Sequence, residues 1–319
     1  MRERITCMGE TLIDFLPIID ADRTTGFGMF AGGSVMNVAV GLARLDAPSN
    51  FSGKVSNDFF GRFLRSYIQN EGVDTRFLLD DPAPSTLAFV AMEHGEAAYA
   101  FYGDQAADTR LTFAELPQAL FDETAIFHTG SISLLRGQTP DAILSSYKQL
   151  KGQALLSFDP NIRPSLVHDE AAYRSLLDSM FGLADLVKLS TVDTEWLFPA
   201  MTPAAAAASI HAKGPAVVII TRGDEGVLAV YGSHPNDIVE VPSFAITLAD
   251  TVGAGDSFSG GILASLHKRG VWSREQLLAL PVEELSAVLH FAAAVAAITC
   301  TRSGANPPHS AEVEAFLAQ

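Results

Sequence analysis

The sequence predicts an α/β protein whose mostly parallel sheet is flanked by helices, with a small inserted β lid. Apolar runs of strand length alternate along the chain with segments whose apolar residues recur at helical spacing. This alternation implies parallel strands joined by helical crossovers. Two further segments alternate polar and apolar residues, which is typical of half-exposed antiparallel strands.

The strands and helices can be placed along the chain. Strands are predicted at Ile5–Gly9, Phe51–Val55, Ala125–Thr129, Ala154–Phe158, Leu186–Leu189 and Val217–Thr221. Helices are predicted at Val35–Leu45, Phe59–Ile68, Pro140–Leu150, Ala171–Phe181 and Pro203–Ala212. Thr139 before Pro140 is a good helix start, because a hydroxyl can cap the first turn and Pro is tolerated there. Ligands of such sheets gather at the carboxyl ends of the strands.

The two alternating segments are Leu12–Ile19 and Thr86–Tyr102, the second arranged around a His94-Gly95 turn. We interpret them as a β lid formed by residues 12–30 and 85–103, with boundaries that are approximate. The lid is inserted into a single domain that spans residues 1–319. No linker, repeat or low-complexity tail is visible in the sequence.

The composition argues against several classes of protein. The net charge of −16 disfavours a nucleic-acid or anionic-membrane surface. Two cysteines, Cys7 and Cys300, make no disulfide framework and fit a reducing cytoplasm. The N-terminus lacks an apolar export signal, and no apolar run is long enough to span a bilayer, so Phe291–Thr299 is interpreted as a buried helix. The histidines form no metal-binding pattern, and His128 is interpreted as a core residue.

The segment Asp250–Phe258 is the most informative part of the chain. It places a glycine-flanked turn directly before Asp256, where a helix with Ile262 and Leu266 on its apolar face begins. A helix N-terminus offers unpaired amides and a positive dipole end, and glycines let the backbone approach an anion. A carboxylate beside such a cradle can take a proton from a hydroxyl while a phosphoryl group is attacked. The segment therefore predicts a kinase that acts on a small alcohol.

A second motif, Gly32–Asn37, joins paired glycines to the start of a predicted helix. The glycines would let the backbone approach a substrate, and Asn37 would supply a directional amide. Asp14, on a lid strand, could accept hydrogen bonds from sugar hydroxyls. The alternatives are an ordinary loop leading into a helix and a solvated carboxylate.

Three polar clusters follow predicted strands, at the sheet edge where ligands gather. Asp159–Pro164 either contacts a ligand or forms an Asp-Pro turn. Lys188–Glu195 carries Asp193 and Glu195, which either hold Mg²⁺ through water or lie in the first turn of a capped helix. Thr221–Gly226 either meets phosphates through its threonine and glycines or forms a tight turn between strands.

Three other interpretations of the late motif are weaker. A serine hydrolase with Ser257 as nucleophile would need a histidine and an acid to complete a triad. The dinucleotide motif lacks its third glycine because Phe258 stands there, and the chain has no P-loop sequence. A sugar-binding protein without activity would need no base at Asp256.

Taken together, Gly32–Asn37 and Asp250–Phe258 resemble the signatures of the PfkB (ribokinase-like) carbohydrate kinase family. The resemblance covers essentially the whole chain. It implies a ribokinase-like α/β fold with a β lid, and ATP-dependent phosphorylation of a sugar hydroxyl. It also implies Mg²⁺ with the ATP, potassium as a further cation, and a homodimer that forms through the lid.

The resemblance also assigns roles to residues by position. Asp256 resembles the catalytic base, and Gly253, Ala254 and Gly255 resemble an anion hole for the transferred phosphoryl. Residues that resemble sugar contacts are Asp14, Gly32, Gly33, Asn37, Phe101, Asn161 and Arg163. Residues that resemble ATP contacts are Lys188, Ser190, Thr221, Gly223, Gly226 and Gly255. Asp250 and Ser303 resemble a monovalent-cation site, while Asp193 and Glu195 stay the candidates to hold Mg²⁺ through water.

Three segments look most like bacterial fructokinases, so fructose is the expected acceptor. They are Gly9–Phe15, His128–Ile132 and Asp159–Pro164. A 2-keto-3-deoxygluconate kinase, which shares parts of these segments, and other sugar or nucleoside kinases are the alternatives.

The chain departs from the family pattern at three places. Ser56-Asn57 stands where the family often has Gly-Asp. Ser190 and Asp193 occupy the positions of the usual Asn and Glu in the metal-associated motif. Gly103 follows Tyr102 in the lid, where fructokinase-like lids often carry Arg, and this change leaves the exact sugar open.

Overall fold

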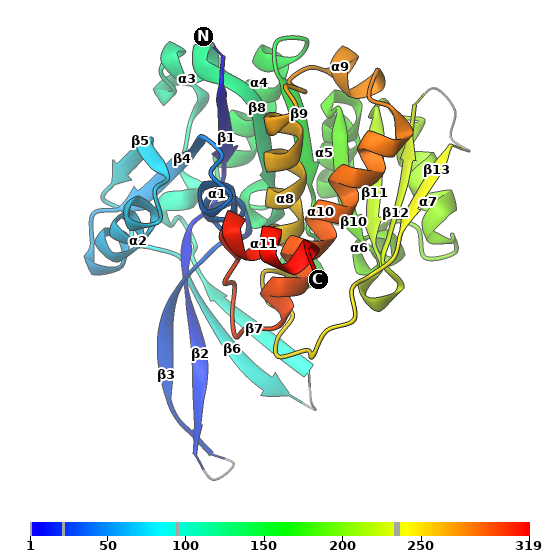
Figure 1. Cartoon of the computed structure of the whole chain (residues 1–319). Coiled ribbons are helices and arrows are strands. Elements are labelled where there is room, and N and C mark those ends of the chain that lie inside the picture. The colour runs from blue at the N-terminus through cyan, green and yellow to red at the C-terminus, as the bar shows by residue number, and fades with distance from the viewer. Residues whose placement is uncertain (1, 21–22, 94–95, 233–236) are drawn as a thin grey trace.

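The computed structural model describes residues 2–20, 23–93, 96–232 and 237–319, with the backbone alone for residues 90–93 and 96–99. The expected turn at His94-Gly95 lies outside the described residues. The described chain forms a nine-stranded sheet between two layers of helices and a separate four-stranded sheet that projects away from it (Figure 1).

The main sheet has the strand order β13-β12-β11-β10-β9-β8-β1-β4-β5. Its strands are β1 (Arg4–Met8), β4 (Ser49–Ser56), β5 (Asp74–Asp81), β8 (Thr124–Gly130), β9 (Leu155–Asp159), β10 (Leu186–Ser190), β11 (Val217–Thr221), β12 (Val227–Tyr231) and β13 (Ile238–Val241). Neighbouring strands from β5 to β11 in this order pair in parallel, and β12 and β13 extend the sheet by antiparallel pairing. The predicted fold class is confirmed.

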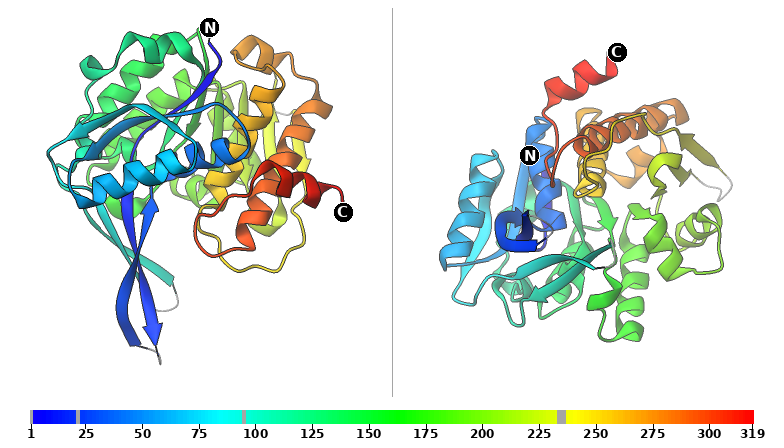
Figure 2. Two further views of the ribbon diagram at one scale, coloured as in Figure 1. Left: turned by 60° about the vertical axis from the view of Figure 1, so that its left-hand side comes forward. Right: turned by 90° about the horizontal axis from the view of Figure 1, so that it is seen from below.

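Two hydrophobic clusters lie on opposite faces of this sheet, and a layer of helices covers each. One layer contains α1 (Ser34–Arg44), α2 (Phe59–Asn70), α8 (Ala254–Lys268), α9 (Arg274–Leu278), α10 (Val282–Cys300) and α11 (Ser310–Leu317). The other contains α3 (Gln118–Glu123), α4 (Thr139–Leu150), α5 (Glu170–Leu183), α6 (Thr191–Leu197) and α7 (Pro203–His211). Figure 2 shows the helices on both sides of the sheet.

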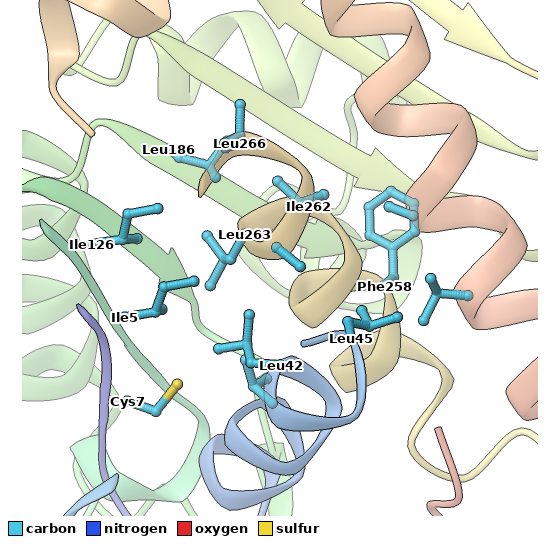
Figure 3. Packing of buried hydrophobic residues seen from close by; sticks show 14 of the residues in the cluster. Ile5, Cys7, Leu42, Leu45, Ile126, Leu186, Phe258, Ile262, Leu263 and Leu266 are labelled. Carbon is cyan, nitrogen blue, oxygen red and sulfur yellow. The ribbon is translucent and has the colours of Figure 1, made fainter. Parts of the chain in front are cut away.

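The core under α8 explains why this helix is held firmly. Phe258, Ile262 and Leu266 lie on its buried face, as their spacing predicted, in the same hydrophobic cluster as Leu42 of α1 and Ile5 of β1 (Figure 3). Fully burying a side chain of this size contributes about 1.5–3 kcal/mol. The packing fixes the position of the α8 N-terminus relative to the sheet, and that N-terminus carries the late motif.

Each strand and helix predicted for the main domain is present, with ends within two residues of the predicted ones, except that Phe291–Thr299 forms only the second half of a longer helix, α10. The prediction missed the strands β5, β12 and β13 and the helices α3, α9 and α11. β5 and β13 are the two edge strands of the sheet. Edge strands are half exposed and carry charged residues, such as the acids that begin and end β5, so they lack the continuous apolar signal of central strands.

The lid is a four-stranded sheet of order β3-β2-β6-β7. Its strands are β2 (Leu12–Asp20), β3 (Arg23–Gly32), β6 (Leu87–Glu93) and β7 (Glu96–Tyr102). The two hairpins come from separate parts of the chain, and β2 pairs with β6 in parallel at Ile13–Phe15 and Leu87–Phe89. β2 and β3 extend away from the main sheet in Figure 1.

The helix α10 is longer than the buried helix that the sequence analysis expected at Phe291–Thr299. It has 19 residues and is apolar enough to span a membrane by length and composition alone. However, 56% of its apolar window is buried inside the domain, where it packs along α8. We therefore interpret it as a core helix, which is how Phe291–Thr299 was predicted.

Candidate active site

Most of the residues singled out from the sequence lie at the carboxyl edge of the parallel strands or in the segments facing it. The strands β9, β10 and β11 end at Asp159, Ser190 and Thr221. The N-termini of α1 and α8 carry Ser34 and Asp256, whose side chains are in direct contact. The early and late motifs therefore meet, although more than 200 residues separate them in the chain.

The turn before α8 requires glycine at its first position. Gly253 has a left-handed backbone (φ 75°), and a Cβ there would lie 2.6 Å from the Cβ of Ala305. The Ala254 amide donates to the Thr251 carbonyl. Within the described part of the chain, the amides of Gly253 and Gly255 have no hydrogen-bond partner. These two amides, rather than that of Ala254, are thus available to an anion.

The carboxylate of Asp256 is buried and held at both oxygens. Ser34 Oγ donates to Oδ1 at 2.6 Å, and Asn37 Nδ2 donates to Oδ2 at 2.8 Å. Burial raises the pKa of Asp256, with Asp159 acting in the same direction, while the two hydrogen bonds and Lys188 lower it. A carboxylate with a raised pKa is a better proton acceptor than one in water.

The loop after β9 contacts Ser34 from the other side. Asn161 Nδ2 donates to Ser34 Oγ at 2.9 Å, and Arg163 Nη1 donates to Asn161 Oδ1 at 2.6 Å. Asn161 has a positive φ of 37°, a conformation that asparagine tolerates better than most residues. Two sugar contacts expected from the resemblance are thereby connected to the carboxylate of Asp256 through one serine.

Behind the turn lies a buried ion pair. Lys188 Nζ is 2.8 Å from Asp159 Oδ2, and both side chains are buried. The same ammonium lies 3.0 Å from where a Cβ on Gly255 would be, so it sits directly against the start of α8. Burial lowers the pKa of Lys188, but the charge of Asp159 and the hydrogen bond to it raise that pKa by more, so the ammonium stays charged.

The lid contributes Asp14. A Cβ on Gly32 would overlap Asp14 Oδ2, so the glycine makes room for this carboxylate. Burial raises the pKa of Asp14 to about 6, with the charge of Asp256 adding to the effect and Arg163 opposing it. Asp14, Arg163 and Asp256 therefore share one electrostatic environment under the lid.

Phe101 lies at the base of the lid, against a small apolar cluster that includes Leu12, Ile132 and Leu166. The guanidinium carbon of Arg136 lies 5.8 Å from the centroid of its ring. Phe101 can thus supply an apolar wall to a sugar pocket.

A cavity of about 680 Å³ borders the N-terminus of α8. The segment Thr221–Gly226, the loop Ser243–Leu248 and the start of α8 contribute to its wall, together with the small side chains of α10. Residues on this wall include Thr221, Gly223, Gly226, Gly255, Phe258, Ala293, Ala296, Ala297 and Cys300. Its volume is in the range of small-molecule sites, and Gly255 is shared between the cavity and the anion cradle.

Ser190 and Asp193 form the capping box of α6. Asp193 accepts hydrogen bonds from Ser190 N and Oγ and from Ile162 N, so both of its oxygens are used. Glu195 is exposed, and residues two apart on a helix face different directions. Among the described residues no group of three potential ligand side chains gathers around a metal position. The structure thus gives Asp193 the helix-capping role that the sequence left as an alternative, whereas Glu195 lies beyond the first turn of α6.

Asp250 joins the late motif to the segment after α10. Its Oδ1 accepts from Val252 N at 3.1 Å, and its Oδ2 accepts from Gly304 N at 2.8 Å. Ser303, its neighbour in the predicted cation site, is exposed. Asp250 and the 303–304 segment are brought together as expected.

Two other expectations can be settled by geometry. Ser257 is buried and accepts a hydrogen bond from Thr299 Oγ1, and no histidine or acid among the described residues bonds to it, so the structure does not support a hydrolase nucleophile here. His128 is buried beside Ser157 Oγ at 3.0 Å, and burial lowers its pKa to about 3. His128 is a satisfied core histidine, as predicted.

Sequence reasoning missed two parts of this site. Ser34 stands inside the quoted early motif, but its contact with Asp256 appears only in the folded chain. Glu10 is fully buried beneath α1, where its carboxylate accepts from Ser133 Oγ and from Val35 N at 3.4 Å. Gly33, at the helix N-cap, has no side chain, so Glu10 supplies the acceptor for the first turn.

Comparisons with known proteins agree with this geometry. The model of the pfkB family carbohydrate kinases matches residues 2–312. The chain is 36% identical over 284 residues to a fructokinase of Rhizobium leguminosarum bv. trifolii, covering 88% of this chain and 85% of that protein. The structure of a Xylella fastidiosa fructokinase with bound ATP matches with a TM-score of 0.91 and 30% identity, covering 100% of this chain and 99% of that one. A Vibrio cholerae O395 fructokinase double mutant, solved with fructose, ADP and a potassium ion, matches with a TM-score of 0.85 and 28% identity over 99% and 98% of the two chains.

The fold and the site define a phosphotransferase in which a buried carboxylate stands beside a helix N-terminus that can receive a phosphoryl group. The chain belongs to the pfkB family of carbohydrate kinases. The predicted family and class of enzyme are confirmed.

Proposed function

We propose that this carbohydrate kinase transfers the γ-phosphoryl group of ATP to a hydroxyl of fructose, with Asp256 as the general base. The observation that carries the proposal is the position of Asp256. Its carboxylate lies between polar side chains under the lid and the amides at the start of α8, which border the cavity. The family and the fructokinases that the chain resembles supply the substrate class.

The proposed step is an in-line displacement. The sugar hydroxyl oxygen bonds to the γ-phosphorus as the bond from that phosphorus to the bridging oxygen of ADP breaks. The hydroxyl proton moves to the carboxylate of Asp256. Ser34 and Asn37 keep the carboxylate in one orientation, and positioning of this kind, with electrostatics, provides most of the rate in phosphoryl transfer.

Three groups would stabilise the charge on the transferred phosphoryl. The free amides of Gly253 and Gly255 point from the N-terminus of α8, which carries the positive end of the helix dipole. The ammonium of Lys188 lies against Gly255, paired with Asp159. We assign Lys188 to the phosphate side of the site, acting through its charge.

The cavity fits the nucleotide. Its volume suits a molecule of this size, its walls are mostly apolar, and Gly255 borders both it and the anion cradle. Thr221, Gly223 and Gly226 belong to its wall, where they can contact ATP. Ser190 lies opposite Thr221 on the neighbouring strand β10, and its hydroxyl donates a hydrogen bond to Asp193.

The described residues do not build a protein-held magnesium site, because Asp193 is used by the α6 cap and Glu195 is exposed. Mg²⁺ commonly binds through substrate phosphates and keeps several waters. We therefore expect Mg²⁺ to enter with ATP. For a monovalent cation, we propose the segment held by Asp250 near Ser303, since the Vibrio cholerae relative was solved with potassium.

We propose a cytoplasmic homodimer that forms through the lid. The lid strands expose Ile18, Ile19, Phe27 and Phe30, an apolar set that a second copy could cover. Both cysteines are free, as in a reducing compartment. Light scattering of Ile19→Asp and wild type tests the dimer, which is contradicted if the wild type is a monomer at micromolar concentration.

An ADP-release screen tests the proposed function. It compares fructose with ribose, 2-keto-3-deoxygluconate, tagatose phosphate and nucleosides at equal concentration. We expect fructose to give the highest kcat/KM. If 2-keto-3-deoxygluconate is turned over and fructose is not, the proposed substrate is wrong and the acidic keto sugar takes its place. ADP release that does not depend on any sugar would contradict the kinase assignment.

A further inference from the structure

The hydrogen bonds around Ser34 form a chain with one possible direction. Arg163 can only donate, so Asn161 accepts through Oδ1, and its Nδ2 must then face Ser34. Ser34 accepts this bond through Oγ and has one proton left, which it donates to Asp256 Oδ1 at 2.6 Å. A carboxylate accepts only, so the chain ends there.

The four residues come from three parts of the chain. Arg163 and Asn161 lie on the loop after β9, Ser34 is the first residue of α1, and Asp256 is in the first turn of α8. The packed core holds α1 and α8 against each other, so the distance between Ser34 and Asp256 is set by the fold rather than by a flexible loop.

We propose that Ser34 is a positioning residue for the base. Its hydroxyl couples the hydrogen bonds made by the Asn161–Arg163 loop to the orientation and proton affinity of the Asp256 carboxylate. This inference rests on the proposed role of Asp256. Since Asn161 and Arg163 are also the residues proposed to meet the sugar, a sugar that takes their hydrogen bonds would change the donation to Asp256. The base would then be adjusted by the presence of its own substrate.

Other charges also face Asp256. Asp14 approaches from the lid, and Asp159 and Lys188 from β9 and β10. The Ser34 hydrogen bond lowers the pKa of Asp256, because it stabilises the ionised form. Removing the hydroxyl should raise that pKa while the other charges stay in place. As the pH is lowered, Asp256 should then become protonated, and activity should be lost, at a higher pH than in the wild type.

The test is the pH dependence of kcat/KM for fructose with ATP, which reports groups of the free enzyme. In Ser34→Ala we expect the acidic limb of this kcat/KM profile to move to higher pH by about one unit. We also expect kcat at neutral pH to fall about tenfold, as for a lost hydrogen bond to a charged group. KM for ATP should not change. Ser34→Thr keeps the hydroxyl and should restore both the limb and kcat.

A matched control and a double-mutant cycle separate this role from a general effect on structure. Ser52→Ala removes a buried hydroxyl that has no hydrogen-bond partner in the described part of the chain, and it should leave the pH profile unchanged.

Asn161→Ala should move the acidic limb in the same direction as Ser34→Ala and raise KM for fructose. In the Ser34→Ala background it should still raise KM but move the limb no further.

An unchanged acidic limb in Ser34→Ala, or additive limb shifts in the cycle, would overturn the proposal. So would a Ser34→Thr variant that behaves like Ser34→Ala. The variant Asp256→Asn keeps the two hypotheses apart. If it retains turnover, the proposed base is wrong; if it is inactive while Ser34→Ala has a normal profile, the role of Ser34 alone is wrong.

Discussion

The two halves of the active site are built in opposite ways. Around Asp256, polar side chains from separate segments hold one another by hydrogen bonds. In the neighbouring cavity, the wall of α10 is made of alanines and one cysteine, and the polar contributions come largely from turns. A hydrogen-bonded network fixes individual atoms, whereas an apolar cavity fixes only a shape. Changes on the first side should therefore affect turnover, and changes on the second should affect nucleotide affinity.

The largest expected effect is that of Asp256→Asn, which removes the proton acceptor but keeps the size of the side chain. We expect kcat to fall about 10²- to 10⁴-fold, the usual contribution of a general base. Nucleotide affinity, measured by calorimetry with ATP, should stay near that of the wild type because the cavity is untouched. Turnover like that of the wild type would contradict the assignment of the base.

Gly253→Ala tests the border between the two halves. The left-handed backbone costs an alanine about 1–2 kcal/mol, and the added Cβ would also overlap Ala305. Gly270→Ala is the matched control, since Gly270 has a similar φ of 71° but open space around it. We expect Gly253→Ala to have the lower melting temperature of the two and a kcat reduced by up to about 100-fold, because the amides shift. Equal melting temperatures for the two variants would show that Ala305 does not constrain the turn.

Ala297→Leu tests the cavity side. The larger side chain would fill space that the proposal gives to the nucleotide, so KM for ATP should rise about tenfold, an effect of about 1.4 kcal/mol. KM for fructose and the acidic limb of the pH profile should not change. Ala287→Leu, at an exposed position of the same helix, is the control. If Ala297→Leu changed KM for fructose instead, the cavity would belong to the sugar.

The smallest expected effect concerns Glu10, which supports α1 from below. Burial raises the pKa of Glu10 to about 7, above its ordinary value of 4.5. An acid whose pKa is raised by folding stabilises the protein below its unfolded pKa and loses this contribution as pH rises through the folded one. Wild-type stability should therefore fall between about pH 4.5 and 7, by up to about 1.4 kcal/mol per pH unit from this group.

In Glu10→Gln this contribution to the slope should be absent, because the amide does not ionise. Denaturant unfolding at several pH values measures the difference. Asp14 and Asp108, whose pKa values are also raised to about 6, contribute to both proteins, so only the difference between the slopes reports Glu10. Identical slopes would show that folding does not raise the pKa of Glu10.

The sequence allowed the main sheet, its flanking helices and the residues at its carboxyl edge to be predicted, since these depend on local periodicity and on motifs. Asp256 and its glycines were found because turn and helix start are contiguous. The pairing of Lys188 with Asp159 was not found. It depends on the register of β9 against β10, which no local pattern encodes.

The cavity could not be predicted for a related reason. Its walls come from segments 221–227, 243–258 and 293–300, which meet only after the chain has folded. The role of Ser34 could not be inferred either, since a serine in the first turn of a helix can bond to many groups. Only the packing of α1 against α8 selects Asp256 as its acceptor.

The lid has a consequence for how this enzyme can be altered. Its two hairpins, β2-β3 and β6-β7, are far apart in the sequence, and the parallel pairing of β2 with β6 joins them into one sheet. A lone two-stranded hairpin is only marginally stable in water, and removing one here would leave the other with an unpaired edge. The lid is therefore one sheet formed by two separate segments of the chain. Deleting or exchanging either hairpin alone would expose an unpaired strand edge with which other chains could aggregate.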